Sequence, residues 1–160
     1  MKEYKIEAIV HIYEMAELSE EDRLLVEAAK RATNGSYAPY SKFNVGAAVR
    51  LQDGTIVLGA NQENAAYPSG LCAERTALFA AGAQYPTQPV VALAIAARKG
   101  KRFLTKPISP CGACRQVISG MEERFGIPIR ILLYGTDGIL VSDGITPLLP
   151  LRFVDEDMNL

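Results

Sequence analysis

The chain has 160 residues, of which 49% are hydrophobic and 22% are charged. A chain of this length forms one domain around a single core and needs no disulfide framework. Its 17 Lys and Arg residues nearly balance its 18 Asp and Glu residues, which gives no general attraction to a nucleic-acid backbone. The longest apolar run, Val90 to Ala97, is far shorter than the roughly 20 residues that cross a bilayer. We therefore expect one domain over residues 1–160, with neither nucleic-acid nor membrane partners.

Residues 1–18 form an N-terminal extension in which we expect a strand over Lys2–Tyr13. Its apolar residues alternate with charged or mixed ones, which is the period of a half-buried strand: Tyr4, Ile6, Ala8, Val10 and Ile12. Acidic residues interrupt this apolar series, so the segment does not resemble a secretory signal. We therefore expect a cytoplasmic protein.

The rest of the chain alternates between helix and strand patterns. Ser19 followed by Asp22 resembles a capping box at a helix start, and Asp53-Gly54 is typical of a tight hairpin turn. We expect, in chain order, a helix over Ser19–Thr33, hairpin strands over Val45–Leu51 and Ile56–Leu58, a helix over Leu71–Gln84, a strand over Val90–Ala97, a helix over Cys111–Phe125, strands over Ile129–Tyr134 and Ile139–Ser142, and a short helix over Gly144–Leu149. This order predicts an α/β fold, a three-layer α/β/α sandwich with a central mixed sheet of about five strands.

Three cysteines are the first chemical signal of the chain. Cys72 begins one predicted helix, whereas Cys111 and Cys114 begin another and share one face of it. An odd number of cysteines without an export signal favours metal or redox chemistry over a disulfide framework. Helix N-termini lower thiol pKa values, and a soft site of three thiolates selects zinc. The sequence therefore predicts a zinc site whose fourth position is open to water.

Glu74 lies two residues after Cys72 and is the candidate proton carrier of this site. A carboxylate beside a zinc-bound water is placed to accept its proton and pass it on. His11, the only histidine, is on the polar side of the N-terminal strand, so we expect it to be solvated rather than a fourth ligand. A metal-binding Cys followed by Glu, and then Pro-Cys-x-x-Cys, is the arrangement of zinc deaminases.

Four segments of the sequence resemble the cytidine deaminase family, in its small homotetrameric type with three cysteine ligands. These segments are Tyr40–Ala48, Asn61–Pro68, Cys72–Ala77 and Pro110–Gln116. The resemblance implies that one zinc ion per chain is bound by Cys72, Cys111 and Cys114. It also implies that Glu74 moves the proton and that Arg75 hydrogen-bonds the cysteine sulfurs.

The same resemblance implies the substrate contacts. Phe43, Asn61 and Glu63 would line the sugar pocket, and the backbone N–H of Ala73 would meet the pyrimidine carbonyl. Tyr67 and Phe153 would reach the active site of a neighbouring subunit in a homotetramer. The implied activity is zinc-dependent hydrolytic deamination of cytidine and deoxycytidine to uridine and deoxyuridine, with release of ammonia, as in pyrimidine salvage.

Three other functions remain open from the residues alone. The substrate could be a modified nucleoside or an aminonucleoside antibiotic, although paired hydroxyl-binding groups at Asn61 and Glu63 suit an unmodified ribose. A deaminase acting on bases within RNA or DNA is disfavoured by the balanced charge. A binding module with a structural zinc would have a closed coordination shell. We expect Arg115 and Gln116 to be structural in each case.

Overall fold

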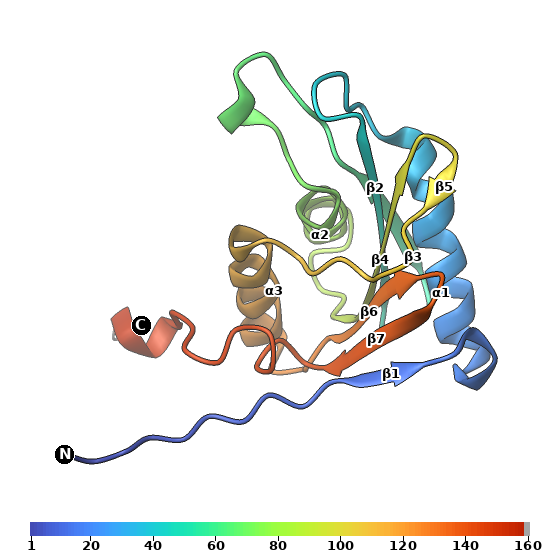
Figure 1. The fold of residues 1–160 in the computed structure, drawn as a ribbon. Helices are drawn as coiled ribbons and strands as arrows, with labels where there is room; N and C mark the ends of the chain where they lie inside the picture. Colours follow the sequence, from blue (N-terminus) through green and yellow to red (C-terminus); the bar gives the residue numbers. More distant parts are fainter. Residues whose placement is uncertain (159–160) are drawn as a thin grey trace.

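The computed structural model describes residues 1–158 and consists of one mixed sheet with helices on both faces (Figure 1). The strands are β1 (His11–Tyr13), β2 (Phe43–Leu51), β3 (Ile56–Ala60), β4 (Val90–Lys99), β5 (Arg102–Phe103), β6 (Arg130–Gly135) and β7 (Gly138–Asp143). The α-helices are α1 (Glu20–Ala32), α2 (Ala73–Gln84) and α3 (Gly112–Phe125). The predicted three-layer α/β/α fold is confirmed, with seven strands instead of about five. Residues 159 and 160, the end of the predicted domain, lie outside the described residues.

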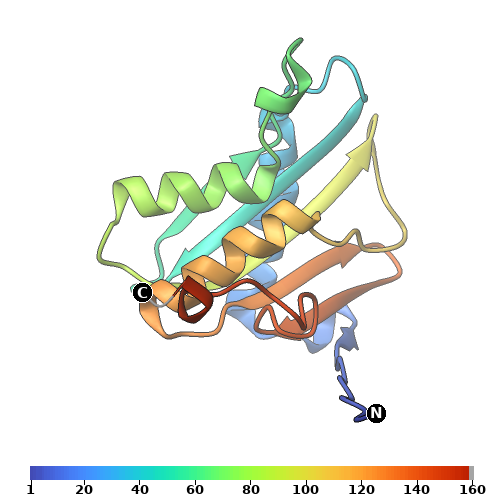
Figure 2. The ribbon, with the colours of Figure 1, turned by 90° about the vertical axis from the view of Figure 1, so that its left-hand side faces the viewer.

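The order and direction of the strands place the starts of two helices at one end of the strands. The sheet runs β1-β7-β6-β4-β2-β3, and β5 pairs with β4. Both β3 and β4 are antiparallel to β2, so β3 and β4 run in the same direction. The helix that follows β3 is α2, and the helix that follows β4 is α3. Both helices therefore begin at the same end of the strands, and they lie side by side on one face of the sheet (Figure 2).

Each face of the sheet has its own hydrophobic core. Alternate residues of the central strand β4 point to opposite faces, as the strand period requires. Leu93 and Ile95 pack into the cluster beneath α2 and α3, whereas Ala92 and Ala94 pack into the cluster beneath α1. The predicted strand over Val90–Ala97 is thereby confirmed, and it is buried on both faces.

The predicted helix starts and the main hairpin are also confirmed. The hydroxyl of Ser19 accepts a hydrogen bond from the backbone N–H of Asp22 at 3.2 Å, which caps α1. The Asp53-Gly54 turn joins β2 to β3, and Gly54 adopts a positive φ of 90° that suits glycine. Among residues 1–158, no helix is both long and apolar enough to span a membrane.

One predicted element, the N-terminal strand, is too long, and another, the helix over residues 144–149, is wrong. The N-terminal strand covers only His11–Tyr13, and residues 1–10 are exposed, because β7 pairs with β1 over three positions only. Residues 144–149 do not form a helix. They make a turn instead, in which the backbone N–H groups of Leu148 and Leu149 donate to the carbonyl of Ile145.

Candidate metal centre and active site

The three cysteines meet where α2 and α3 begin. Cys72 is the N-cap residue of α2, Cys111 is the N-cap residue of α3, and Cys114 lies in the first turn of α3. The Sγ atoms of Cys72 and Cys111 lie 3.8 Å apart, and those of Cys111 and Cys114 lie 3.4 Å apart. All three lie within 4.8 Å of one another. Tetrahedral zinc with Zn–S bonds of about 2.3 Å separates its sulfur ligands by about 3.8 Å, so the donor set fits one zinc ion.

The surroundings of the sulfurs favour thiolates. The N-termini of both helices point their partial positive charge at the cluster. Hydrogen bonds from the side chains of Cys114 and Arg75 lower the pKa of the Cys72 thiol to about 5. The hydrogen bond between Cys114 and Cys72, together with burial, raises the pKa of the Cys114 thiol. Binding of a metal ion would require these thiols to lose their protons.

Arg75 lies against the cluster as the resemblance implied. Its Nη2 atom donates to the Sγ of Cys72 at 3.8 Å. Within the described residues, its buried Nε atom has no hydrogen-bond partner. The contact with Cys72 raises the pKa of the guanidinium, which therefore stays charged beside the sulfurs.

Glu74 is the second residue of α2 and is only 5% exposed. Burial raises the pKa of its carboxyl group, and the neighbouring Cys72 thiolate acts in the same direction. A carboxyl group with a raised pKa takes up a proton at a higher pH than an exposed glutamate does, which suits a general acid and base.

A cavity of about 400 Å³ opens beside the cysteines and Glu74. It is lined by Ser41, Phe43, Val45, Asn61, Glu63, Tyr67, Cys72, Ala73, Glu74, Ile108, Ser109 and Cys111. The predicted site residues therefore line one cavity, except for Cys114 and Arg75, which lie in the cluster beside it, and Phe153, which does not line it. The volume and the mainly apolar walls with a few polar groups are typical of a small-molecule site.

Asn61 and Glu63 stiffen the wall of this cavity. The Oδ1 atom of Asn61 accepts from the backbone N–H of Val45 at 2.8 Å, and its Nδ2 atom donates to the carbonyl of Phe43 at 2.9 Å. The Oε2 atom of Glu63 accepts from the backbone N–H groups of Tyr40 and Ser41. Hydrogen bonding from the Ser41 side chain lowers the pKa of Glu63, which is therefore ionised. One carboxylate oxygen of Glu63 is left to accept from a ligand.

The remaining singled-out residues lie away from the cavity. Phe153 is exposed on the C-terminal segment, and its carbonyl accepts from the Nε2 atom of Gln116 at 2.7 Å. Arg115 donates to the carbonyls of Pro110 and Leu148. Within residues 1–158, the side chains grouped to hold a metal are the three cysteines, and His11 is not among them.

Four lining residues were not singled out from the sequence: Ser41, Val45, Ile108 and Ser109. Ser41 and Val45 fall within the Tyr40–Ala48 segment, so that motif was the signal for them. Ile108 and Ser109 precede Pro110 in an irregular loop without periodicity. Only their closeness to Cys111 in the chain could have indicated them.

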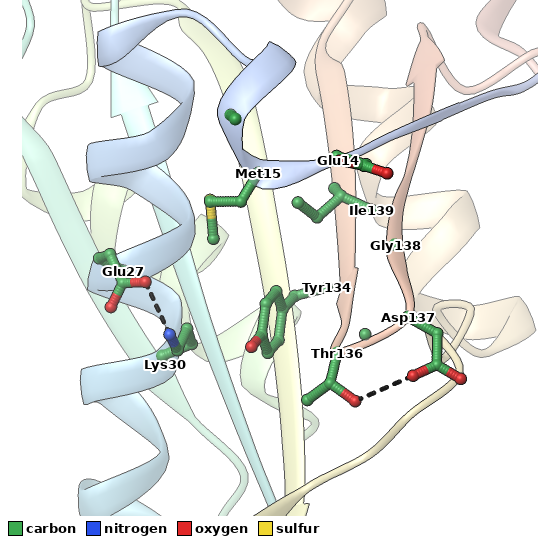
Figure 3. A pocket seen from close by; sticks show the side chains of 11 residues that line it. Glu14, Met15, Glu27, Lys30, Tyr134, Thr136, Asp137, Gly138 and Ile139 are labelled. Carbon is green, nitrogen blue, oxygen red and sulfur yellow. Dashed lines mark hydrogen bonds and ion pairs between the residues drawn. The ribbon is translucent and has the colours of Figure 1, made fainter.

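A second cavity, of about 510 Å³, lies on the other side of the sheet and shares no residue with the first. Glu27 and Lys30 of α1 face Tyr134, Thr136 and Asp137 at the turn between β6 and β7 (Figure 3). Lys30 pairs with Glu27 at 2.6 Å and lies 4.9 Å from the Tyr134 ring centroid. These contacts explain the cavity as part of the packing of α1 on the sheet.

Comparison with known proteins agrees with this geometry. The family model described as the cytidine and deoxycytidylate deaminase zinc-binding region matches residues 19–125. A cytidine deaminase of Halalkalibacterium halodurans is 42% identical over 137 residues, which cover 86% of this chain and 97% of that protein. The crystal structure of cytidine deaminase from Burkholderia pseudomallei superimposes with a TM-score of 0.71 at 39% identity, covering 85% of this chain and 100% of that one.

A further relative has a different name. A blasticidin-S deaminase of Bacillus cereus is 30% identical over 138 residues, which cover 85% of this chain and 94% of that protein. The matched region of the family model contains all three cysteines and Glu74. On the extent of these matches, the chain belongs to the cytidine and deoxycytidylate deaminase family.

Proposed function

We propose that the protein is a zinc-dependent hydrolase that deaminates cytidine and deoxycytidine to uridine and deoxyuridine and releases ammonia. The observation that supports this most is one cavity that joins two kinds of group. A thiolate cluster and a buried carboxyl group form one end, and polar groups suited to a sugar form the other. A structural zinc module would have no need of a cavity that opens onto its ligands.

Cys72, Cys111 and Cys114 hold the zinc ion in this proposal. When bound, zinc supplies Lewis acidity that lowers the pKa of a water molecule in its open position. Glu74 would accept one proton of a water molecule and deliver it to N3 of the cytosine ring while the water oxygen bonds to C4. It would then carry the proton of the hydroxyl group so formed at C4 to the amino group. The C4–N bond breaks, ammonia leaves, and the C4 carbonyl of the uracil ring forms. The raised pKa of Glu74 favours each return to the protonated form.

The rest of the cavity orients the nucleoside. The backbone N–H of Ala73, at the start of α2, has no partner within the helix and is suited to donate to the pyrimidine carbonyl. Phe43 supplies an apolar wall, and Glu63 accepts from ribose hydroxyls. The Asn61 side chain is bonded to Val45 and Phe43 of β2 and also accepts from the hydroxyl of Ser36, so its contribution is to fix the wall and offer its remaining amide hydrogen.

Arg75 offsets the charge of the site. Three thiolates and one Zn²⁺ carry a net charge of −1, which makes the metal a weaker Lewis acid than in a site of neutral ligands. The positive guanidinium beside Cys72 and the two helix N-termini offset part of this net negative charge.

The proposal extends to assembly and location. A homotetramer is supported by the exposure of Tyr67 and Phe153, which are 63% and 56% exposed in the single chain. In this proposal both residues reach the site of a neighbouring copy, and Tyr67 also borders the cavity of its own chain. A cytoplasmic location is supported by three cysteines arranged for a metal, since thiols persist in a reducing compartment.

The relative named blasticidin-S deaminase favours a second candidate substrate, blasticidin S, in place of cytidine and deoxycytidine. This candidate corresponds to the antibiotic substrate that the residues alone leave open.

The test is release of ammonia by the zinc-loaded protein from cytidine, deoxycytidine, cytosine, adenosine, blasticidin S and a short oligonucleotide. We expect turnover of the first two only. Turnover of blasticidin S alone would support the second candidate, and no turnover with one zinc per chain would contradict both.

A further inference from the structure

The first ten residues precede the edge strand β1 and are exposed along their whole length. This N-terminal arm (residues 1–10) runs on from β1 and stands away from the body in both views (Figures 1 and 2). Every residue of the arm is exposed, and the pairing of β1 with β7 ends at His11. The arm is therefore an extended segment outside the sheet, and its backbone groups are open to a partner on both sides.

The composition of the arm is that of a half-buried strand. Its even-numbered positions from Tyr4 to Val10 are apolar, and Lys5 and Glu7 lie on the opposite face. Large apolar side chains of the even-numbered face are nevertheless exposed: Tyr4 is 83% exposed and Ile6 is 42% exposed. Ile9, on the face of Lys5 and Glu7, is also exposed. An exposed segment with strand-like alternation that continues from the edge strand of a sheet is a template for pairing with another chain.

The charge pattern of the arm complements itself. In an antiparallel pair of two identical arms with the two-fold axis at Ile6, Lys5 of each arm lies opposite Glu7 of the other. The same register sets Tyr4 opposite Ala8 on the apolar face. An axis at Lys5 or at Glu7 would instead set like charges opposite one another. An axis between residues would set apolar positions opposite charged ones.

We propose that the N-terminal arm pairs with the same arm of a second copy of this chain, as an antiparallel ribbon centred on Ile6. Lys5 and Glu7 already form an ion pair within each arm, and pairing of two arms replaces these two contacts with two equivalent ones between the arms. A two-stranded ribbon is only marginally stable alone, so the arms add to other contacts between copies. The inference does not depend on the proposed deaminase activity.

The register can be tested by disulfide formation in two matched variants of the zinc-loaded protein, Ile6→Cys and Glu3→Cys. At the axis, two copies of residue 6 have Cα atoms about 5 Å apart, within reach of a disulfide. Two copies of residue 3 are about 20 Å apart in the same ribbon. We expect an intermolecular disulfide in Ile6→Cys under mild oxidation and little in Glu3→Cys. Zinc content and ammonia release are followed separately, so that damage to the metal site is distinguished from loss of pairing.

A charge exchange tests the self-complementarity. Adding Lys5→Glu to Ile6→Cys sets glutamates opposite one another twice, and we expect disulfide formation to slow about tenfold. Adding Lys5→Glu and Glu7→Lys together restores the opposite charges and the rate. Equal cross-linking in Ile6→Cys and Glu3→Cys, no cross-linking in either, or no response to the charge exchange would each overturn the proposal.

Discussion

Cys72 and Cys111 are 39 residues apart in the chain, yet their Sγ atoms lie 3.8 Å apart. Each is the residue that caps the start of its helix, α2 for Cys72 and α3 for Cys111. The two helices start together because β3 and β4 run in the same direction, both being antiparallel to β2. The topology of the sheet thus brings two helix N-termini and three sulfurs to one point, next to the cavity that contains Glu74.

Replacing Cys111 by serine should remove the metal ion and part of the stability. The variant Cys111→Ser leaves two sulfurs, so we expect less than one zinc per chain and a lower melting temperature. Zinc at a thousandfold excess over its Kd stabilises the folded chain by about 4 kcal/mol, which the variant loses. Metal analysis and calorimetry measure both effects, with Glu123→Gln on the same helix as the control. A variant that retains a full zinc ion would show that Cys111 is not a ligand.

Replacing Glu74 by glutamine should stop the chemistry without disturbing the metal. Glutamine keeps the shape of this buried side chain but cannot accept and return a proton. We expect ammonia release to fall by about 10²–10⁴ while zinc content and melting temperature stay close to those of the parent. Glu27→Gln, in the second cavity, is the control and should keep full activity. If Glu74→Gln turned over cytidine at the parental rate, another group would have to carry the proton.

Replacing Arg75 should weaken the metal site through Cys72. Because the Nη2 atom of Arg75 donates to the Cys72 sulfur, we expect Arg75→Gln to lose about 10–100-fold in zinc affinity or activity with the fold retained. Arg75→Lys keeps the charge and should lose less. Competition with a zinc chelator gives the affinities. Equal zinc affinity and turnover in all three proteins would exclude this role.

The helices and central strands could be predicted because their signals are local. Apolar residues recur with the helical period in α1, and Ser19 caps it. The apolar run Val90–Ala97 indicated the strand β4. The cysteine cluster could also be predicted, because Cys111 and Cys114 are one helical turn apart and Cys72 begins a second helix.

The parts that the sequence could not predict depend on long-range partners. Alternation from Tyr4 to Ile12 indicated burial, but no part of residues 1–158 covers the arm, and only His11–Tyr13 forms a strand. Asn61 was assigned to the sugar alone, whereas its side chain also binds the backbone of Phe43 and Val45. No periodicity indicates a contact of that kind.

The close packing of α2 on β3 gives a prediction about stability. A Cβ atom on Gly59 would lie 2.4 Å from the backbone nitrogen of Ala77 and 2.5 Å from the carbonyl oxygen of Ala73, so the helix would have to move. We expect Gly59→Ala to destabilise the fold by about 1–3 kcal/mol or more, and to lower activity because α2 carries Glu74. Gly120→Ala is the matched control: it is exposed in α3 with nothing within 4 Å, and should stabilise by about 1 kcal/mol. Denaturant unfolding measures both, and equal stability of the two variants would contradict the close approach of α2 to β3.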